Sequence, residues 1–126
     1  MSIIEDKVLM LNSLSLDKFY AQEQVSAGNL VNSGTPGYKR RVLEASCGFL
    51  DQMENAKELL EGKHKGRVDF QMEIKSEEGL SMQKDGNSVD RDAESIEMTK
   101  ANFGFRCAEI CLNSRFAMLG TVINSK

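Results

Sequence analysis

The amino-acid sequence predicts a mainly α-helical protein, with two long helices and a small β element between them. Two long stretches, residues 5–32 and the segment from about residue 89 onward, show helical periodicity and contain no proline. Residues 68–75 instead alternate strictly between apolar and polar side chains, which is the pattern of a half-buried strand. A chain of 126 residues forms one domain at most.

The first helix is predicted over residues 5–32 and carries apolar side chains on two opposite faces, given about 100° per residue. One face holds Ile4, Val8, Leu11, Phe19, Val25 and Leu30, and the other holds Leu9, Leu16, Tyr20, Ala27 and Val31. A helix with two apolar stripes needs two neighbours, whereas a single stripe needs one. Periodicity alone leaves open that it is the buried central helix of a small bundle.

A helix stop and a turn are predicted in residues 29–40. Gly34 is expected to take the left-handed conformation that closes a helix. Pro36, the only proline of the chain, cannot continue a helix and pushes Thr35 into an extended conformation. Pro36 and Gly37 are then the central residues of a turn, because proline presets the first position and glycine tolerates positive φ at the second.

The middle of the chain is predicted to contain a shorter helix and a hairpin. The helix is expected from Val42 to about Leu60, with its break in residues 62–66. Val68 to Ile74 is the predicted strand, and residues 80–83 are expected to pair back with it. Because two strands alone are marginal in water, their apolar face is expected to rest on a helix.

The last helix is predicted to begin near Val89, with Ser88 or Asp90 as its cap. Apolar residues repeat every seven positions along it, which is typical of a coiled-coil seam. The seam consists of Met98, Phe105, Leu112 and Leu119, with Ala101, Ala108 and Val122 in the partner positions. A second heptad series lies roughly on the far side and consists of Ile96, Phe103, Ile110 and Ala117.

Composition excludes several classes of function. The 16 basic and 19 acidic residues are mixed along the chain, and no basic block or stripe indicates a nucleic-acid partner. No apolar run approaches the roughly 20 residues of a membrane span. Charged residues at positions 5–7 interrupt the N-terminal apolar residues, so no signal peptide is expected.

No catalytic or metal-binding constellation is predicted, so we expect neither an enzyme nor a cofactor. The sequence offers no nucleophile with a base, no phosphate-binding loop and no paired carboxylates in an apolar setting. His64 is interpreted as a solvated loop residue. The odd cysteine count, Cys47, Cys107 and Cys111, argues against a disulfide framework. Cys107 and Cys111 are interpreted as small apolar packing residues rather than zinc ligands.

Two short stretches carry a resemblance to a known family. The first is Asn29-Leu30-Val31-Asn32 followed by Thr35-Pro36-Gly37-Tyr38-Lys39, and the second is Asp85-Gly86-Asn87-Ser88-Val89-Asp90 with Asp92 and Glu94. The spacing of the tail also matches, through Asn102, Phe105, Leu112, Asn113, Arg115, Phe116 and Leu119. The chain resembles the bacterial flagellar rod, hook and filament-junction proteins, and most of all the proximal rod type of the basal body. It departs from the family pattern at Gly34, where an acidic residue is usual.

The resemblance implies a fold and a structural role. The two long helices would run antiparallel as a coiled coil, dividing the chain into residues 1–40, a middle segment 41–87 that packs outside, and residues 88–126. The protein would be a subunit of the periplasmic rod that transmits torque from motor to hook. It would leave the cytoplasm unfolded through the flagellar type III export gate, without a cleaved signal peptide.

The resemblance also implies partners and site residues. The partners would be other rod proteins, copies of itself, and the base of the export gate with the adaptor between it and the rod. The site residues would be an assembly turn and the seam, namely Asn29, Asn32, Thr35, Pro36, Gly37 and Tyr38 for the turn and Met98, Phe105, Leu112 and Leu119 for the seam. A hypothesis from another class is a soluble helical adaptor, or a secretion chaperone that binds partner helices.

Overall fold

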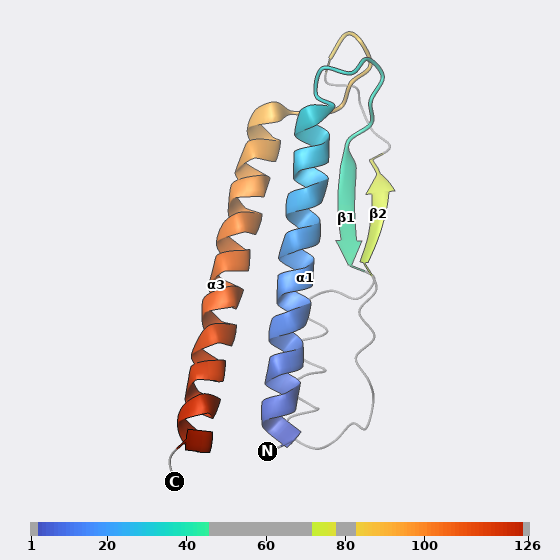
Figure 1. Ribbon diagram of the computed structural model, residues 1–126. Coiled ribbons are helices and arrows are strands. Elements are labelled where there is room, and N and C mark those ends of the chain that lie inside the picture. The colour runs from blue at the N-terminus through green and yellow to red at the C-terminus, as the bar shows by residue number, and fades with distance from the viewer. Residues whose placement is uncertain (1–2, 46–71, 78–82, 125–126) are drawn as a thin grey trace.

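The computed structural model describes residues 3–45, 72–77 and 83–124 (Figure 1). Four elements follow one another along the chain: helix α1 (Ile3–Val31), strand β1 (Arg41–Ala45), strand β2 (Met72–Ser76) and helix α3 (Arg91–Asn124). Helix α1 therefore begins and ends, and α3 begins, within a few residues of the predicted bounds.

The two helices pack against each other in opposite directions, so the N-terminus of α1 and the C-terminus of α3 lie at the same end of the molecule (Figure 1). Side-chain contacts give their register. Asn102 Nδ2 lies 3.3 Å from Glu23 Oε1, and Asn12 Nδ2 lies 3.5 Å from Cys111 Sγ, nearer the free ends. The predicted fold class, mainly helical with two paired long helices and a small sheet, is confirmed.

The strand pair lies on the other side of α1 from α3 (Figure 1). Strand β1 pairs antiparallel with β2, so that Arg41 stands opposite Ser76 and Ala45 opposite Met72. Helix α1 thus has a neighbour on each side, as its two apolar faces require.

The structure corrects one prediction for the middle of the chain. The helix predicted from Val42 is wrong over residues 42–45, which form β1, and the rest of that range lies outside the described residues. Residues 68–71 and 80–82 also lie outside them, so the predicted pairing of residues 80–83 falls there too; within the described residues, β2 pairs with β1. A short apolar run does not distinguish strand from helix, and here the long-range ladder with β2 decides the conformation.

The buried residues concentrate where the helices are joined, and most of them are small or polar. The buried apolar residues are Val25, Val89, Ala101 and Ala108, and the buried polar residues are Ser26, Asn29, Ser33, Asn87, Ser88 and Glu94. The centre of the described structure is therefore a polar cluster at the turn end of the helix pair. None of the described helices combines the length and the apolar character that a membrane crossing demands.

Candidate functional site

The predicted turn at Pro36 and Gly37 is present. The backbone N–H of Tyr38 donates to the carbonyl of Thr35 at 3.2 Å, which closes a four-residue turn. Gly37 has φ of 71°, the positive value that the third position of a type II turn requires, and Pro36 occupies the second. The chain therefore reverses at a position where only glycine is free of steric cost.

Helix α1 ends through local side-chain and backbone hydrogen bonds, without a left-handed glycine. The prediction for Gly34 is wrong, because the only positive-φ glycines among the described residues are Gly37 and Gly86. Instead, Ser33 Oγ donates to the carbonyl of Leu30 at 2.7 Å. Asn32 Nδ2 donates to the carbonyl of Gly28 at 2.9 Å. The same carbonyls also accept backbone N–H groups at 3.2 Å, Gly28 from Asn32 and Leu30 from Ser33, so the helix end is satisfied locally without a left-handed glycine.

Asn29 joins the end of α1 to the start of β1. Its side-chain amide pairs with the backbone of Arg41 in both directions: Oδ1 accepts from the N–H at 2.9 Å, and Nδ2 donates to the carbonyl at 2.8 Å. Tyr38 also places its hydroxyl 3.4 Å from the same oxygen. Asn29 is fully buried. Its amide therefore hydrogen-bonds to the backbone of β1 in the same way as a residue of a neighbouring strand would.

Asn87, which lies just before α3, hydrogen-bonds to the turn that follows α1. Its Nδ2 lies within hydrogen-bonding distance of three backbone carbonyls: Asn32 at 3.0 Å, Ser33 at 3.1 Å and Thr35 at 2.9 Å. Its Oδ1 accepts from the N–H of Val89 at 2.8 Å, and the side chain is fully buried. We call Asn29, Asn32, Ser33, Thr35 and Asn87 the polar latch, since their amide, hydroxyl and carbonyl groups connect the end of α1 to the entry of α3.

Backbone bonds reinforce the polar latch. The N–H of Gly37 donates to the carbonyl of Asp85 at 3.0 Å, and the N–H of Ser88 donates to the carbonyl of Tyr38 at 3.1 Å. Gly86 has φ of 86°, and a Cβ added to it would lie 3.6 Å from the Cα of Gly37. The segments after α1 and before α3 therefore run side by side, with a glycine of each at the closest approach.

Asp90 caps α3, as one of the two predicted alternatives. Its Oδ1 accepts from the backbone N–H of Asp92 at 2.9 Å and of Ala93 at 3.2 Å. These bonds satisfy two of the donors that a helix start leaves open.

A buried ion pair braces the first turn of α3. Arg40 Nε donates to Glu94 Oε1 at 2.5 Å, and Arg40 Nη1 lies 3.2 Å from Glu77 Oε2. Only 1% of the Glu94 side chain is exposed, and its Oε2 is buried without a hydrogen-bond partner within the described part of the chain. Burial alone would lower the pKa of Arg40, but the hydrogen bonds and charges of Glu94 and Glu77 outweigh it and raise that pKa.

Small residues form the centre of the contact between the helices. Ala101 and Ala108 are buried, while the predicted seam residues Met98, Phe105, Leu112 and Leu119 are half-buried. Gly104 faces the ring of Phe19 with no room for a Cβ. Two of the three predicted partner positions, Ala101 and Ala108, are therefore buried, whereas the third, Val122, is 72% exposed.

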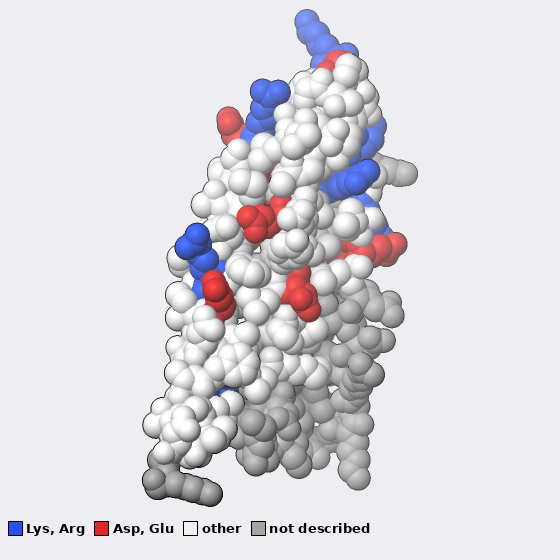
Figure 2. All heavy atoms as spheres, viewed as in Figure 1, with Lys and Arg blue, Asp and Glu red and all other residues white. Residues whose placement is uncertain are grey.

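The opposite face of α3 is apolar and open. Ile96, Phe103 and Ile110 are 55%, 70% and 65% exposed. From Cys107 to the end of α3 the sequence contains only Glu109 and Arg115 as charged residues, and Figure 2 shows a largely uncharged surface over that end of the helix. We call Ile96, Phe103 and Ile110 the outer stripe.

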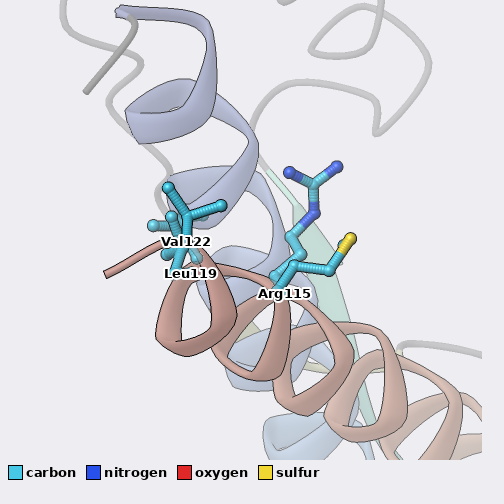
Figure 3. A pocket seen from close by; sticks show the side chains of 5 residues that line it. Arg115, Leu119 and Val122 are labelled. Carbon is cyan, nitrogen blue, oxygen red and sulfur yellow. The ribbon is translucent and has the colours of Figure 1, made fainter. Parts of the chain in front are cut away.

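A hollow of about 240 Å³ opens between the helices near their free ends. Figure 3 shows Leu119 and Val122 together at the end of α3 and Arg115 about one turn before them. The hollow is lined by Leu9, Arg115, Met118, Leu119 and Val122. It offers an apolar surface rather than a constellation of catalytic groups.

The described residues gather no group of three or more His, Cys, Asp or Glu side chains that would hold a metal ion. Cys107 and Cys111 are free and exposed, so they are not buried packing residues within the single chain.

Three of the five residues of the polar latch, Asn29, Asn32 and Thr35, are among the turn residues predicted from the sequence, and other central residues are not. Asn87, Glu94, Ser33 and Arg40 were not among the site residues, although the first two lie in the stretch that carried the family resemblance. An asparagine after glycine in a predicted turn gives only a local signal, because its three carbonyl partners lie more than 50 positions earlier.

Comparison with known proteins finds a distant relative. The chain is similar to the flagellar basal body rod protein FlgB of Bacillus subtilis (strain 168), with 26% identity over 114 residues, covering 86% of this chain and 87% of that protein. No family model matches the chain.

Proposed function

We propose that this protein is a structural subunit of the flagellar basal-body rod. The observation that carries the proposal is the polar latch, in which hydrogen bonds join the two separated stretches that resemble the rod family. The similarity to a rod protein extends over most of both chains, which supports the same role. The turn residues Asn29, Asn32, Thr35, Pro36, Gly37 and Tyr38 are proposed to form the assembly turn.

The mechanism would be mechanical. A subunit that transmits torque between motor and hook must resist sliding of its helices against each other. The polar latch ties both helices at one end through Asn87, and close packing of Gly104 against Phe19 opposes displacement along the pair. The seam of Met98, Phe105, Leu112 and Leu119 is proposed to act as a coiled coil that keeps the two helices in register.

Neighbouring subunits would be held by the outer stripe. Exposed apolar surface of this kind marks interaction sites, and contacts between different patches of successive subunits generate a helical assembly when they do not close into a ring. We propose copies of this chain and other rod proteins as the partners along the rod, with the base of the export gate and its adaptor at the proximal end. The location would be the periplasmic rod, reached by type III export without a cleaved signal peptide.

Deletion of the coding sequence in the bacterium that encodes it tests this function. We expect non-motile cells without complete rods, and complementation with the tagged chain should restore motility and place the tag in purified basal bodies. A soluble adaptor or secretion chaperone would instead stay in the cytoplasmic fraction and be absent from basal bodies. Motile deletion cells, or a tag recovered only from the cytoplasm, would contradict the proposal.

The outer stripe offers a sharper variant of this test. Phe103→Asp places a charge at a position that is 70% exposed, so the isolated chain should keep its helical content. If Phe103 packs against another subunit, the same variant should fail to enter basal bodies, because burial of an unpaired charge is costly. Ser95→Asp, at an exposed position next to Ile96 in sequence and therefore about 100° around the helix from it, is the matched control and should assemble.

A further inference from the structure

Two exposed thiols lie one helical turn apart on α3. Cys107 and Cys111 are both free and exposed, whereas cysteine is among the most frequently buried residue types. Residues four apart on a helix lie on the same face, so these thiols are neighbours. Two exposed thiols one turn apart can bind a single ligand together, which points to a chemical role for the pair.

Helix geometry disfavours a disulfide between them. Residues four apart have Cβ atoms about 5–6 Å apart, while a disulfide needs a Cβ separation of about 3.5–4.5 Å. An ion bound between the sulfurs removes the mismatch, because two metal–thiolate bonds of about 2.3 Å hold the sulfurs up to about 4.6 Å apart. Helical side chains also lean toward the N-terminus, which brings the sulfur of Cys111 over the turn that carries Cys107.

The surroundings fit a low-coordinate cation. Asn12 Nδ2 lies 3.5 Å from Cys111 Sγ and orients that sulfur. Arg115 follows Cys111 by one turn, so its positive charge offsets the net negative charge of two thiolates around a monovalent ion. No third His, Cys, Asp or Glu of the described chain joins the pair, which disfavours tetrahedral zinc. Thiolate ligands select soft ions, of which Cu(I) is the monovalent biological example.

We propose that Cys107 and Cys111 form a two-coordinate dithiolate site for Cu(I). On binding, each thiol releases its proton to solvent and two copper–sulfur bonds form, with no change in oxidation state. The site goes beyond the rod function and does not depend on it, so failure of either proposal leaves the other standing.

Competition for Cu(I) tests the site. The full chain with Cys47→Ser serves as the parent, and bathocuproine disulfonate competes for Cu(I) in anaerobic, reducing buffer. We expect one Cu(I) per chain, with an affinity that rises with pH because binding releases protons. Cys107→Ser or Cys111→Ser should each weaken binding by more than about 100-fold, since even loss of an outer-shell partner costs about 10–100-fold.

A relocated thiol provides the matched control. Cys111→Ser combined with Ser114→Cys keeps two exposed thiols but separates them by two turns, and it should bind as weakly as the single variants. Circular dichroism checks that each variant keeps its helices, as expected for exposed positions. The proposal is overturned if either single variant, or the variant with the relocated thiol, binds Cu(I) as tightly as the parent. It is also overturned if one Cu(I) is shared between two chains.

Discussion

Replacement of Asn87 by alanine tests whether the polar latch holds the two helices together. The substitution removes the amide that reaches the carbonyls of Asn32, Ser33 and Thr35, and the oxygen that accepts from Val89 N–H. The carbonyls of Asn32 and Thr35 keep backbone partners, in the N–H groups of Thr35 and Tyr38. The largest losses of stability therefore come from the carbonyl of Ser33 and the N–H of Val89, which lose the partner that Asn87 provides.

The expected loss follows from those two groups. A buried polar group left without a partner costs about 1–3 kcal/mol, and a retained carbonyl that loses one of two bonds costs less. We expect Asn87→Ala to lower the free energy of unfolding by about 2–4 kcal/mol, measured by urea denaturation of the isolated chain with circular dichroism. This is a large fraction of the stability of a small domain.

Two further substitutions make the result specific. Asn87→Asp keeps the shape and the acceptor for Val89 N–H but points a second oxygen at three carbonyls, so it should destabilise at least as much as alanine. Asn113→Ala, on the exposed surface of α3, should change stability by no more than about 0.5 kcal/mol. If Asn87→Ala matches the Asn113 variant, or if Asn87→Asp is as stable as the parent, the latch reasoning is refuted.

Three other predictions concern the turn and the seam. In the same urea assay, Gly37→Ala should destabilise the isolated chain by about 1–2 kcal/mol, because φ is 71° at this position. Its control is Gly28→Ala, which lies within α1 with open space around it and should stabilise the chain by up to about 1 kcal/mol. Pro36→Ala with Gly37→Ala should reduce motility and rod assembly more than secretion, since the helix would then extend through the turn; normal motility would count against the turn as a structural pivot. Phe105→Asp should abolish incorporation into basal bodies, because a charge is costly on the half-buried seam, while export of the unfolded chain should be unchanged. Assembly of this variant would show that the seam assignment is wrong.

Local signals were sufficient for the long helices and the turn. The periodicity of residues 5–32 and the heptads after residue 89 specify which stretches are helical, and Pro36 with Gly37 specifies where the chain reverses. Each of these signals acts within a few residues of the structure that it determines. The helix bounds and the turn could therefore be predicted without knowledge of the tertiary fold.

Long-range contacts decided what the sequence could not predict. Strand β1 is stabilised by β2, which lies about 30 positions later, and by the side chain of Asn29. Residues 42–45 alone fit a helix as well as a strand, because the ladder partner is not visible in the local pattern. The role of Asn87 depends in the same way on which carbonyls the fold brings to it, and the exposure of Cys107 depends on which face of α3 meets α1.

The distribution of side-chain sizes on α3 supports an assembly subunit over a self-contained bundle. The face toward α1 is centred on Ala101, Gly104 and Ala108, while Phe103 and Ile110 point outward and are 70% and 65% exposed. Burial of alanine contributes little apolar stabilisation compared with Phe or Ile, whose full burial is worth about 1.5–3 kcal/mol each. A bundle that folds for its own stability would place the large residues inside. Here the polar latch and small-residue packing set the geometry of the helix pair, and the large apolar residues of the outer stripe stay exposed and are left for contacts with other molecules. A rod requires this arrangement. A subunit whose large apolar residues become buried only on assembly gains its apolar stabilisation from contacts with its neighbours, which therefore hold it firmly.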